Sequence, residues 1–182
     1  PEINRFSRAG YYGGRVECRR LGPVPGGPFV KLDVNSLYPA VMRDGTYPVA
    51  LKQWKRSHAD RSLESRLENG CCLAEVTVRT PVPAYPLRHG GKLCFPTGEF
   101  TTILSSDSLR YAFAQGHIHK VNQYLYFTAA PLFSDFVDTF YPLKAKYKAE
   151  GNEVWEKTVK LVLNSLYGKF GEKRALEVVK GP

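Results

Sequence analysis

The stretch from about 132 to 170 has the apolar spacing of an amphipathic helix with one clear interruption, at Gly151 and Asn152. A glycine commonly ends a helix, and an asparagine commonly starts one. The stretch therefore predicts two helices, over about 132–149 and 152–170. Because so short a turn leaves successive helices antiparallel, we expect these two to pack together as a helical hairpin.

Before this hairpin, the pattern is that of strands broken by turns. Residues 72–80 alternate apolar and polar side chains, which predicts a half-buried strand, and residues 118–127 are also strand-like. The apolar run at 29–33 predicts a buried strand. Strands and helices in this arrangement predict an α+β fold.

Short helices and loops fill the intervals. Asn35 and Ser36 predict the start of a helix that ends near Arg43. Ser105 or Ser106 can cap a further helix, which Gly116 ends. The remaining segments are predicted loops at 10–28 and 81–102 and a charged surface excursion or helix at 52–70.

The 182-residue chain is basic, with 26 Lys and Arg against 17 Asp and Glu and a formal charge of +9. A surface of this kind favours polyanions, of which nucleic acid is the commonest. Charge alone leaves a second interpretation open, a soluble basic protein without such a partner. No apolar run reaches the length of a membrane span, so we expect no membrane partner.

The four cysteines form no CxxC pair, and Cys71 and Cys72 are adjacent. Side chains of adjacent strand residues point to opposite faces, so we expect no bridge between these two. The pattern predicts reduced thiols in a cytosol-like compartment.

The first segment that could carry chemistry is 31–39, KLDVNSLYP. Asp33 ends the predicted strand and comes just before the predicted helix, whose first amides can bind an anion. A carboxylate-bound divalent cation beside a phosphate held by amides is what nucleotidyl transfer requires. The alternative is structural, since Asp-x-x-Ser also occurs as an ordinary helix cap.

The second segment is 160–168, KLVLNSLYG. At about 100° per residue, Lys160, Asn164 and Tyr167 lie along one narrow stripe of a helix, and an apolar stripe lies beside it. Burial of the apolar stripe would leave a lysine, an amide and an aromatic ring in a row, a set suited to a triphosphate and a base or sugar. The alternative is an ordinary amphipathic helix with a solvated polar face.

Together the two segments resemble motifs A and B of family B DNA polymerases. Residues 33–39 match the Asp-x-x-Ser-Leu-Tyr-Pro form of motif A, and residues 160–168 match the Lys-x-x-x-Asn-Ser-x-Tyr-Gly form of motif B. The order and separation of the two motifs also fit. An unrelated basic α+β protein with two chance matches is the weaker alternative.

The resemblance extends over nearly the whole chain. Residues 11–14, YYGG, resemble the Tyr-x-Gly-Gly element that contacts single-stranded DNA in that family. The interval between the motifs, including 92–100 and 132–138, is similar to the insertion that receives the terminal protein in protein-primed polymerases of phages, adenoviruses and linear organellar plasmids. The resemblance thus implies priming by a terminal protein.

The resemblance also implies roles for single residues. Asp33 would be the catalytic acid, and Asp33 and Val34 would be ligands of two Mg²⁺ ions, for which Mn²⁺ can substitute. The amides that would hold the β- and γ-phosphates are those of Val34, Asn35, Ser36 and Leu37. Tyr38 would stack under the deoxyribose and exclude a 2′-hydroxyl.

On motif B, Lys160 would contact the triphosphate, and Asn164 and Tyr167 would lie at the nascent base pair. A further lysine on the preceding helix would also reach the phosphates, and the loop before motif B leaves Lys144 and Lys148 as alternatives. The residues implied in DNA contact are Tyr11, Tyr12, Gly13, Gly14 and Gly168.

In the terms of that family, the expected fold is α+β: a partial palm with a small sheet, an inserted α/β subdomain and an antiparallel two-helix fingers hairpin. The corresponding segments are 1–51 for the first palm part, 52–131 for the continued palm and the terminal-protein-type insertion, 132–172 for the fingers helices, and 173–182 for the start of the return to the palm.

Two parts of the family pattern have no counterpart. The Asp-Thr-Asp of motif C does not occur, and neither do the acidic motifs of the editing domain. Two metal ions about 3.5–4 Å apart need more than one carboxylate. The start at Pro1 and the end at Pro182 also suggest a piece of a longer protein.

We therefore expect the parent protein to be a DNA-directed DNA polymerase that acts on template-primer DNA and dNTPs, and this piece alone to be inactive. The main alternative is a non-catalytic module, derived from a polymerase, that binds only DNA or a terminal protein. The expected location is the cytoplasm, during viral replication in a host cell, or the mitochondrion for an organellar plasmid.

Overall fold

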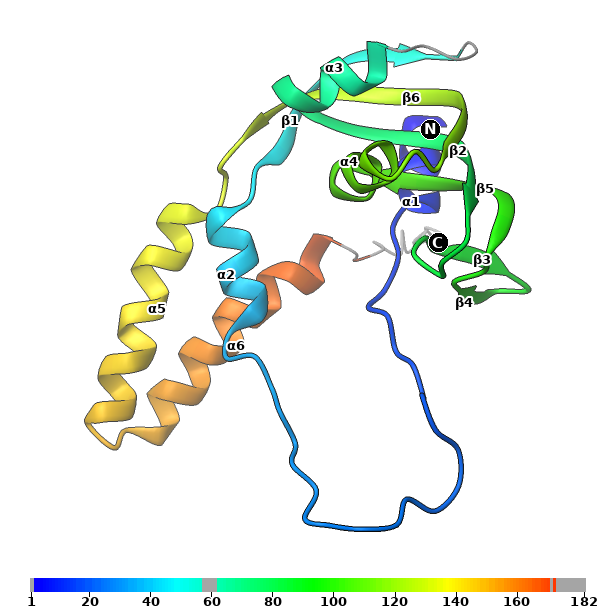
Figure 1. The fold of residues 1–182 in the computed structure, drawn as a ribbon. Helices are drawn as coiled ribbons and strands as arrows, with labels where there is room; N and C mark the ends of the chain where they lie inside the picture. Colours follow the sequence, from blue (N-terminus) through cyan, green and yellow to red (C-terminus); the bar gives the residue numbers. More distant parts are fainter. Residues whose placement is uncertain (1, 57–61, 171, 173–182) are drawn as a thin grey trace, which may run out of the picture. The chain divides into compact units, whose positions relative to one another are not determined.

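The computed structural model describes residues 2–56, 62–170 and 172, without the side chains of Tyr167 and Phe170. The chain forms two compact units, one of Pro1–Val30 with Thr46–Ala130 and one of Lys31–Gly45 with Pro131–Pro182 (Figure 1). The first contains a sheet, and the described part of the second contains only helices. The mixed α+β class is therefore confirmed, while the predicted return to the palm at 173–182 lies outside the described residues.

The first unit is built on a four-stranded antiparallel sheet with the order β1-β6-β2-β5. Its strands are β1 (Tyr47–Lys55), β2 (Cys71–Thr80), β5 (Gly98–Ser105) and β6 (Ile118–Ala130). A small separate hairpin pairs β3 (Leu87–His89) with β4 (Lys92–Cys94). The strands predicted at 72–80 and 118–127 are β2 and β6, so both predictions are confirmed.

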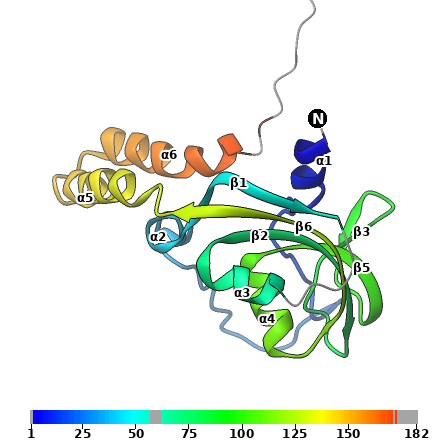
Figure 2. The same ribbon diagram turned by 90° about the horizontal axis from the view of Figure 1, so that it is seen from above.

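The helices of this unit are α1 (Glu2–Ala9), α3 (Ser62–Asn69) and α4 (Ser106–Ala114). α3 and α4 cover one face of the sheet, and α1 lies on the other (Figure 2). On β2, Ala74, Val76 and Val78 are fully buried in the core that α3 and α4 share with the sheet. Next to α1, Gly10 lies so close to the sheet that an added Cβ would come within 2.6 Å of Ile103 Cγ2.

The helix predicted after Ser105 is confirmed. Ser105 is the N-cap of α4, and Gly116 follows the helix with a φ of 65°. This positive φ is tolerated best by glycine, so the residue ends the helix for the predicted reason.

Four strands lie where the sequence analysis predicts none. β1 overlaps the start of 52–70. β3, β4 and the start of β5 lie in the predicted loop at 81–102. β1 and β5 are edge strands, which pair with one neighbour only. Each has β-favouring side chains at alternate positions, Tyr47, Val49 and Leu51 in β1 and Phe100, Thr102 and Leu104 in β5, a signal that sequence reasoning missed.

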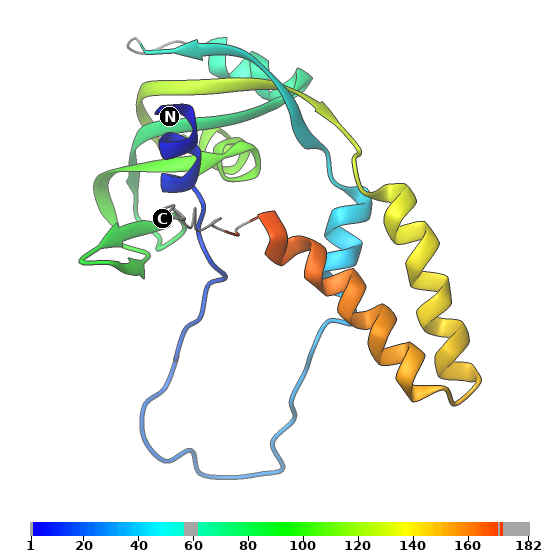
Figure 3. The ribbon, with the colours of Figure 1, turned by 180° about the vertical axis from the view of Figure 1, so that it is seen from behind.

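The second unit consists of α2 (Leu37–Asp44), α5 (Ser134–Ala149) and α6 (Glu153–Phe170). α5 and α6 form an antiparallel hairpin with Gly151 in the turn between them, at a φ of 68° (Figure 3). The predicted helical hairpin is confirmed. α2 packs on both helices, and the buried side chains of this unit include Met42, Val137 and Leu163.

The prediction of a buried strand at 29–33 is wrong. Phe29, Val30 and Leu32 are 72%, 77% and 88% exposed. No described residue pairs with this segment as a strand. A strand needs a neighbour for its amide and carbonyl groups, and an apolar sequence alone does not supply one.

All four cysteines are free, as predicted. Burial raises the pKa of the Cys72 thiol to about 11, so this group stays neutral near neutral pH. Among the helices that the structure describes, none is long and apolar enough to cross a membrane.

Candidate functional site

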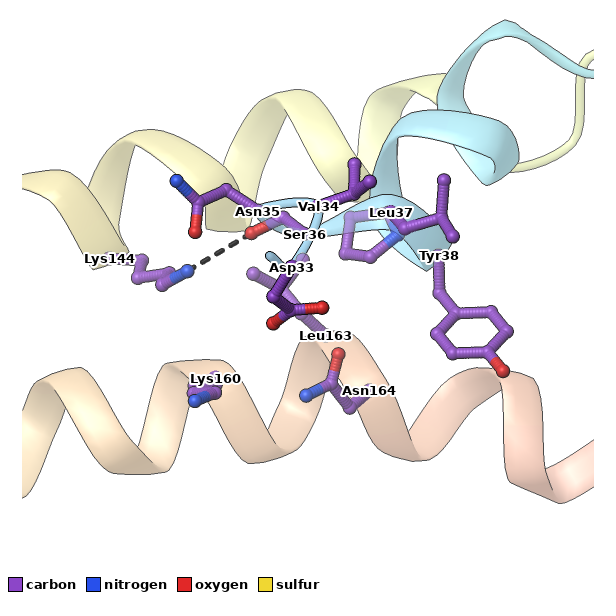
Figure 4. A pocket seen from close by; sticks show the side chains of 11 residues that line it. Asp33, Val34, Asn35, Ser36, Leu37, Tyr38, Lys144, Lys160, Leu163 and Asn164 are labelled. Atoms are coloured by element: carbon purple, nitrogen blue, oxygen red, sulfur yellow. Dashed lines mark hydrogen bonds between the residues drawn. The ribbon is translucent and has the colours of Figure 1, made fainter. Parts of the chain in front are cut away.

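A pocket of about 270 Å³ lies in the helical unit, beside the start of α2 (Figure 4). The segment from Asp33 to Pro39 forms one side, α5 contributes Lys144, and α6 contributes Lys160 and Asn164. Its lining residues are Asp33, Val34, Asn35, Ser36, Leu37, Tyr38, Pro39, Lys144, Lys160, Leu163 and Asn164. The structure thus brings residues of both predicted motifs to one pocket.

Ser36 shapes the turn that leads into α2. Its backbone is left-handed, at φ 55° and ψ 40°, and among the described non-glycine residues it alone has a positive φ. This conformation costs a residue with a side chain about 1–2 kcal/mol, so neighbouring contacts must stabilise it. One such contact comes from Lys144, whose ammonium donates a hydrogen bond to the Ser36 hydroxyl at 3.0 Å.

Ser36 occupies the predicted N-cap position, but its side chain does not cap the helix. The Ser36 carbonyl accepts a hydrogen bond from the Ala40 amide at 3.0 Å, which forms the first turn of α2. The hydroxyl connects α2 to α5 through Lys144 instead. An ordinary Asp-x-x-Ser cap is therefore not what this segment forms.

A second connection holds α2 against α5. The Arg43 Nε donates a hydrogen bond to the Asp138 carboxylate at 2.6 Å, and Arg43 Nη1 donates one to Asp44 at 3.0 Å. The hydrogen bond to Asp138 is the main cause that raises the pKa of Arg43 above its usual value. Sequence reasoning missed this pair because its members lie 95 residues apart. A basic residue in the last turn of a predicted helix was the only available signal.

The predicted polar and apolar stripes are both present on α6. Val159 and Leu163 are buried, while Lys160 and Asn164 are exposed at the pocket. The side chain of Tyr167 lies outside the described part of the chain. Gly168 is exposed on the same helix, and an added Cβ would meet no neighbouring atom within 4 Å.

The two alternatives for the second phosphate-binding lysine occupy different places. Lys144 lines the pocket that contains Asp33, and its ammonium lies 5.9 Å from the centroid of the Tyr141 ring. Lys148, one turn later on α5, lines an adjoining pocket instead. Lys144 therefore shares a pocket with Asp33 and Lys148 does not, while the role of either lysine remains a prediction.

The predicted DNA-contact element lies in the first unit. The Arg88 guanidinium lies 5.3 Å from the centroid of the Tyr12 ring and donates a hydrogen bond to the Tyr11 carbonyl at 2.5 Å. Apart from the chain neighbours, no atom of the described residues lies within 4 Å of a Cβ added at Gly13 or Gly14. Sequence reasoning missed Arg88, which comes from the β3–β4 hairpin and places a cation beside the two tyrosines.

The pocket contains one carboxylate, that of Asp33. Asp33 is exposed there, among amide, hydroxyl and ammonium groups. Within 2–56, 62–170 and 172, no three His, Cys, Asp or Glu side chains form a group that could hold a metal ion. A hard divalent cation binds oxygen atoms. The Asp33 carboxylate could supply one such oxygen, and the other ligands would have to come from elsewhere.

Two solved structures of similar fold are of one DNA polymerase. Phi29 DNA polymerase in an orthorhombic crystal form aligns with a TM-score of 0.57 and 22% identity, over 78% of this chain and 26% of that chain. Phi29 DNA polymerase complexed with primer-template DNA and incoming nucleotide substrates aligns with a TM-score of 0.53 and 22% identity, over 76% of this chain and 25% of that chain. At this identity the likeness concerns the fold.

Residues 1–177 match the family described as DNA polymerase type B, organellar and viral, and the chain belongs to that family. A probable DNA polymerase of Neurospora intermedia is 27% identical in an alignment of 182 residues that covers 93% of this chain and 18% of that protein. A DNA polymerase of Kluyveromyces lactis is 27% identical in an alignment of 156 residues that covers 78% of this chain and 15% of that protein. The family resemblance seen in the sequence is confirmed, and the chain spans less than a fifth of these relatives.

Proposed function

We propose that this chain supplies the motif A and motif B residues of the active site of a DNA-directed DNA polymerase. The observation that supports the proposal is the pocket in which Asp33, Lys144 and Lys160 come together from three segments. A deoxynucleoside triphosphate is a polyanion, and phosphoryl transfer depends on cations that neutralise its charge. Membership of the family supports the same activity for the whole protein.

The pocket also suggests how the nucleotide lies. In Figure 4 the two lysines are on one side of Asp33 and Tyr38 is on the other. The phosphates would lie toward Lys144 and Lys160, near the amides that begin α2. The deoxyribose would lie toward Tyr38, with Asn164 close to the nascent base pair.

Asp33 and the Val34 carbonyl would hold Mg²⁺, or Mn²⁺ in its place, whose charge would stabilise the phosphate oxygens. In the reaction, the primer hydroxyl oxygen forms a bond to the α-phosphorus while the bond from that phosphorus to the β-phosphate oxygen breaks. Pyrophosphate leaves, and the hydroxyl proton passes to water. Lys144 and Lys160 stabilise the charge that develops on the leaving group.

The partners that we propose for the whole protein are template-primer DNA, dNTPs and a terminal protein that supplies the priming hydroxyl. Contact with DNA would involve the segment 11–14, Arg88 and Gly168. We also propose that the protein acts in the cytoplasm of a host cell during viral replication or, for an organellar plasmid, in the mitochondrion.

This segment alone would bind DNA without extending a primer, because one carboxylate cannot hold two metal ions. A binding module without catalysis would behave in the same way as an isolated segment. The two functions differ only in the full-length protein, which is therefore the one to assay.

Primer extension by the full-length protein with Mg²⁺ tests the proposal. Asp33→Asn keeps the side-chain size but removes the charge, and should lower the extension rate by about a thousandfold or more. Asp107→Asn, at a carboxylate that is 97% exposed on α4, is the matched control and should leave the rate unchanged. Extension that survives Asp33→Asn would contradict the proposal. A full-length protein that binds DNA but never extends a primer would favour the binding module.

A further inference from the structure

A second pocket, of about 320 Å³, adjoins the first and shares Asn35, Lys144 and Lys160 with it. Lys148 and Glu156 complete its charged lining, so three lysines and one glutamate face this space. The charged groups of the first pocket are two lysines and one aspartate. The second pocket is therefore the more positive of the two, and it offers room for an anion beside the proposed nucleotide.

Among the described residues, Glu156 forms no ion pair with a lysine of this pocket. Glu153 and Lys157, four residues apart on α6, form an ion pair at 2.8 Å, as this order of charges usually does. Glu156 and Lys160 have the same order and spacing. Yet within the described part of the chain Glu156 forms no ion pair, although its side chain is partly buried. An unpaired negative charge thus lies in the wall of a basic pocket.

We propose that the second pocket receives inorganic pyrophosphate as it leaves and that Glu156 limits how tightly the anion is held. The inference rests on the proposed function, in which pyrophosphate is the leaving group. Because Lys144 and Lys160 line both pockets, the anion can pass from one to the other without losing these cations. Lys148 lines only the second pocket and attracts the anion there, while Glu156 repels it.

Coulomb's law sets the size of the effect. Removal of the one negative charge of Glu156 from a partly exposed pocket should strengthen pyrophosphate binding by about threefold to tenfold. Removal of the one positive charge of Lys148 should weaken it by a similar factor. Tight retention of a product slows turnover, because product release limits the rate of many enzymes. A glutamate in this wall is therefore a way to speed release.

Inhibition of primer extension by pyrophosphate tests the inference on the full-length protein. Glu156→Gln should lower the inhibition constant by about threefold to tenfold, and Lys148→Gln should raise it by a similar factor. The KM for the nucleotide should change less in both variants, since the nucleotide occupies mainly the first pocket. Glu153→Gln, which breaks the ion pair with Lys157 on the same helix, is the matched control and should leave the inhibition constant unchanged.

Calorimetric titration of pyrophosphate into the same full-length variants gives the comparison without catalysis. A protein that fails to extend primers would contradict the proposed function, yet its pyrophosphate affinities would still test the pocket. Equal affinities in the wild type, Glu156→Gln and Lys148→Gln would overturn the inference. So would a KM change as large as the change in pyrophosphate binding, because Glu156 would then act on the first pocket.

Discussion

The sheet unit and the helical unit differ in what lies next to their buried side chains. In the sheet unit, α3, α4 and β2 enclose a core in which Leu63, Val76 and Leu109 have no exposed surface. In the helical unit, buried Leu163 lies at a pocket lined by lysines and an aspartate. The sheet unit thus encloses a core of fully buried apolar side chains, while the helical unit has polar side chains exposed at a pocket beside its buried ones.

The largest effect on stability is therefore expected in the sheet unit. Leu109→Ala removes a fully buried side chain and should lower the free energy of unfolding by about 2–5 kcal/mol. Leu161→Ala, at a position 69% exposed on α6, should change it by about 0.5 kcal/mol or less. Urea unfolding followed by circular dichroism measures both. A comparable loss from Leu161→Ala would show that the outer face of α6 also carries stability.

A substitution in the pocket of the helical unit should change nucleotide selection more than it changes stability. Tyr38→Val opens space beside the proposed deoxyribose and should lower discrimination against ribonucleotides by about tenfold or more, with deoxynucleotide use close to that of the wild type. Tyr111→Val, at a tyrosine on α4 that is 47% exposed against 48% for Tyr38, is the control. Incorporation of the two sugars by the full-length protein measures the ratio, and an unchanged ratio refutes the assigned role of Tyr38.

Ser36 allows stability and function to be separated at one position. Ser36→Gly relieves the left-handed strain but removes the hydrogen bond from Lys144. Because these effects oppose each other, the free energy of unfolding should change by less than about 1 kcal/mol, while the KM for the nucleotide rises about threefold. Ser36→Ala keeps the strain and should add a destabilisation of about 1 kcal/mol. Wild-type KM in both variants would mean that the hydrogen bond does not position the turn.

The smallest effect concerns contact between the sheet unit and DNA. The chain should bind DNA weakly, with log K falling by about 0.7–0.9 per neutralised phosphate per log unit of salt. Arg88→Gln should reduce this slope by about one phosphate contact. Arg79→Gln, whose guanidinium already pairs with Glu99 at 2.7 Å, should change it less. Fluorescence anisotropy over a salt series measures the slope of log K against log salt. Equal slopes in the wild type and Arg88→Gln would show that Arg88 does not contact DNA.

Features that depend on local pattern could be predicted from the sequence. Gly151 and Asn152 mark the hairpin turn, and the spacing of Lys160 and Asn164 places both side chains on the pocket side of α6. Asp33 was found because the motif around it is contiguous. These features need only the geometry of a helix and the identity of neighbouring residues.

Features that depend on a distant partner could not be predicted in this way. The hydrogen bond from Lys144 to Ser36 joins residues 108 positions apart. A local sequence pattern cannot predict it, because the pattern does not show which polar groups come into contact when α2 packs on α5. The segment 29–33 has the composition of a strand but no described strand pairs with it, whereas β1 also has strand-forming residues and pairs with β6. Strand formation follows the partner in both cases.

The motif A helix and its packing partners are made at different times. Lys31–Gly45 belongs to the same compact unit as Pro131–Pro182, although all of Thr46–Ala130 lies between them in the chain. At about 5–20 residues per second, α2 leaves the ribosome several seconds before α5 and α6. Until Lys144 emerges, the turn at Ser36 lacks its hydrogen-bond donor. A protein cut short before Pro131 would therefore retain Asp33 and lose the two helices that line the pocket with it.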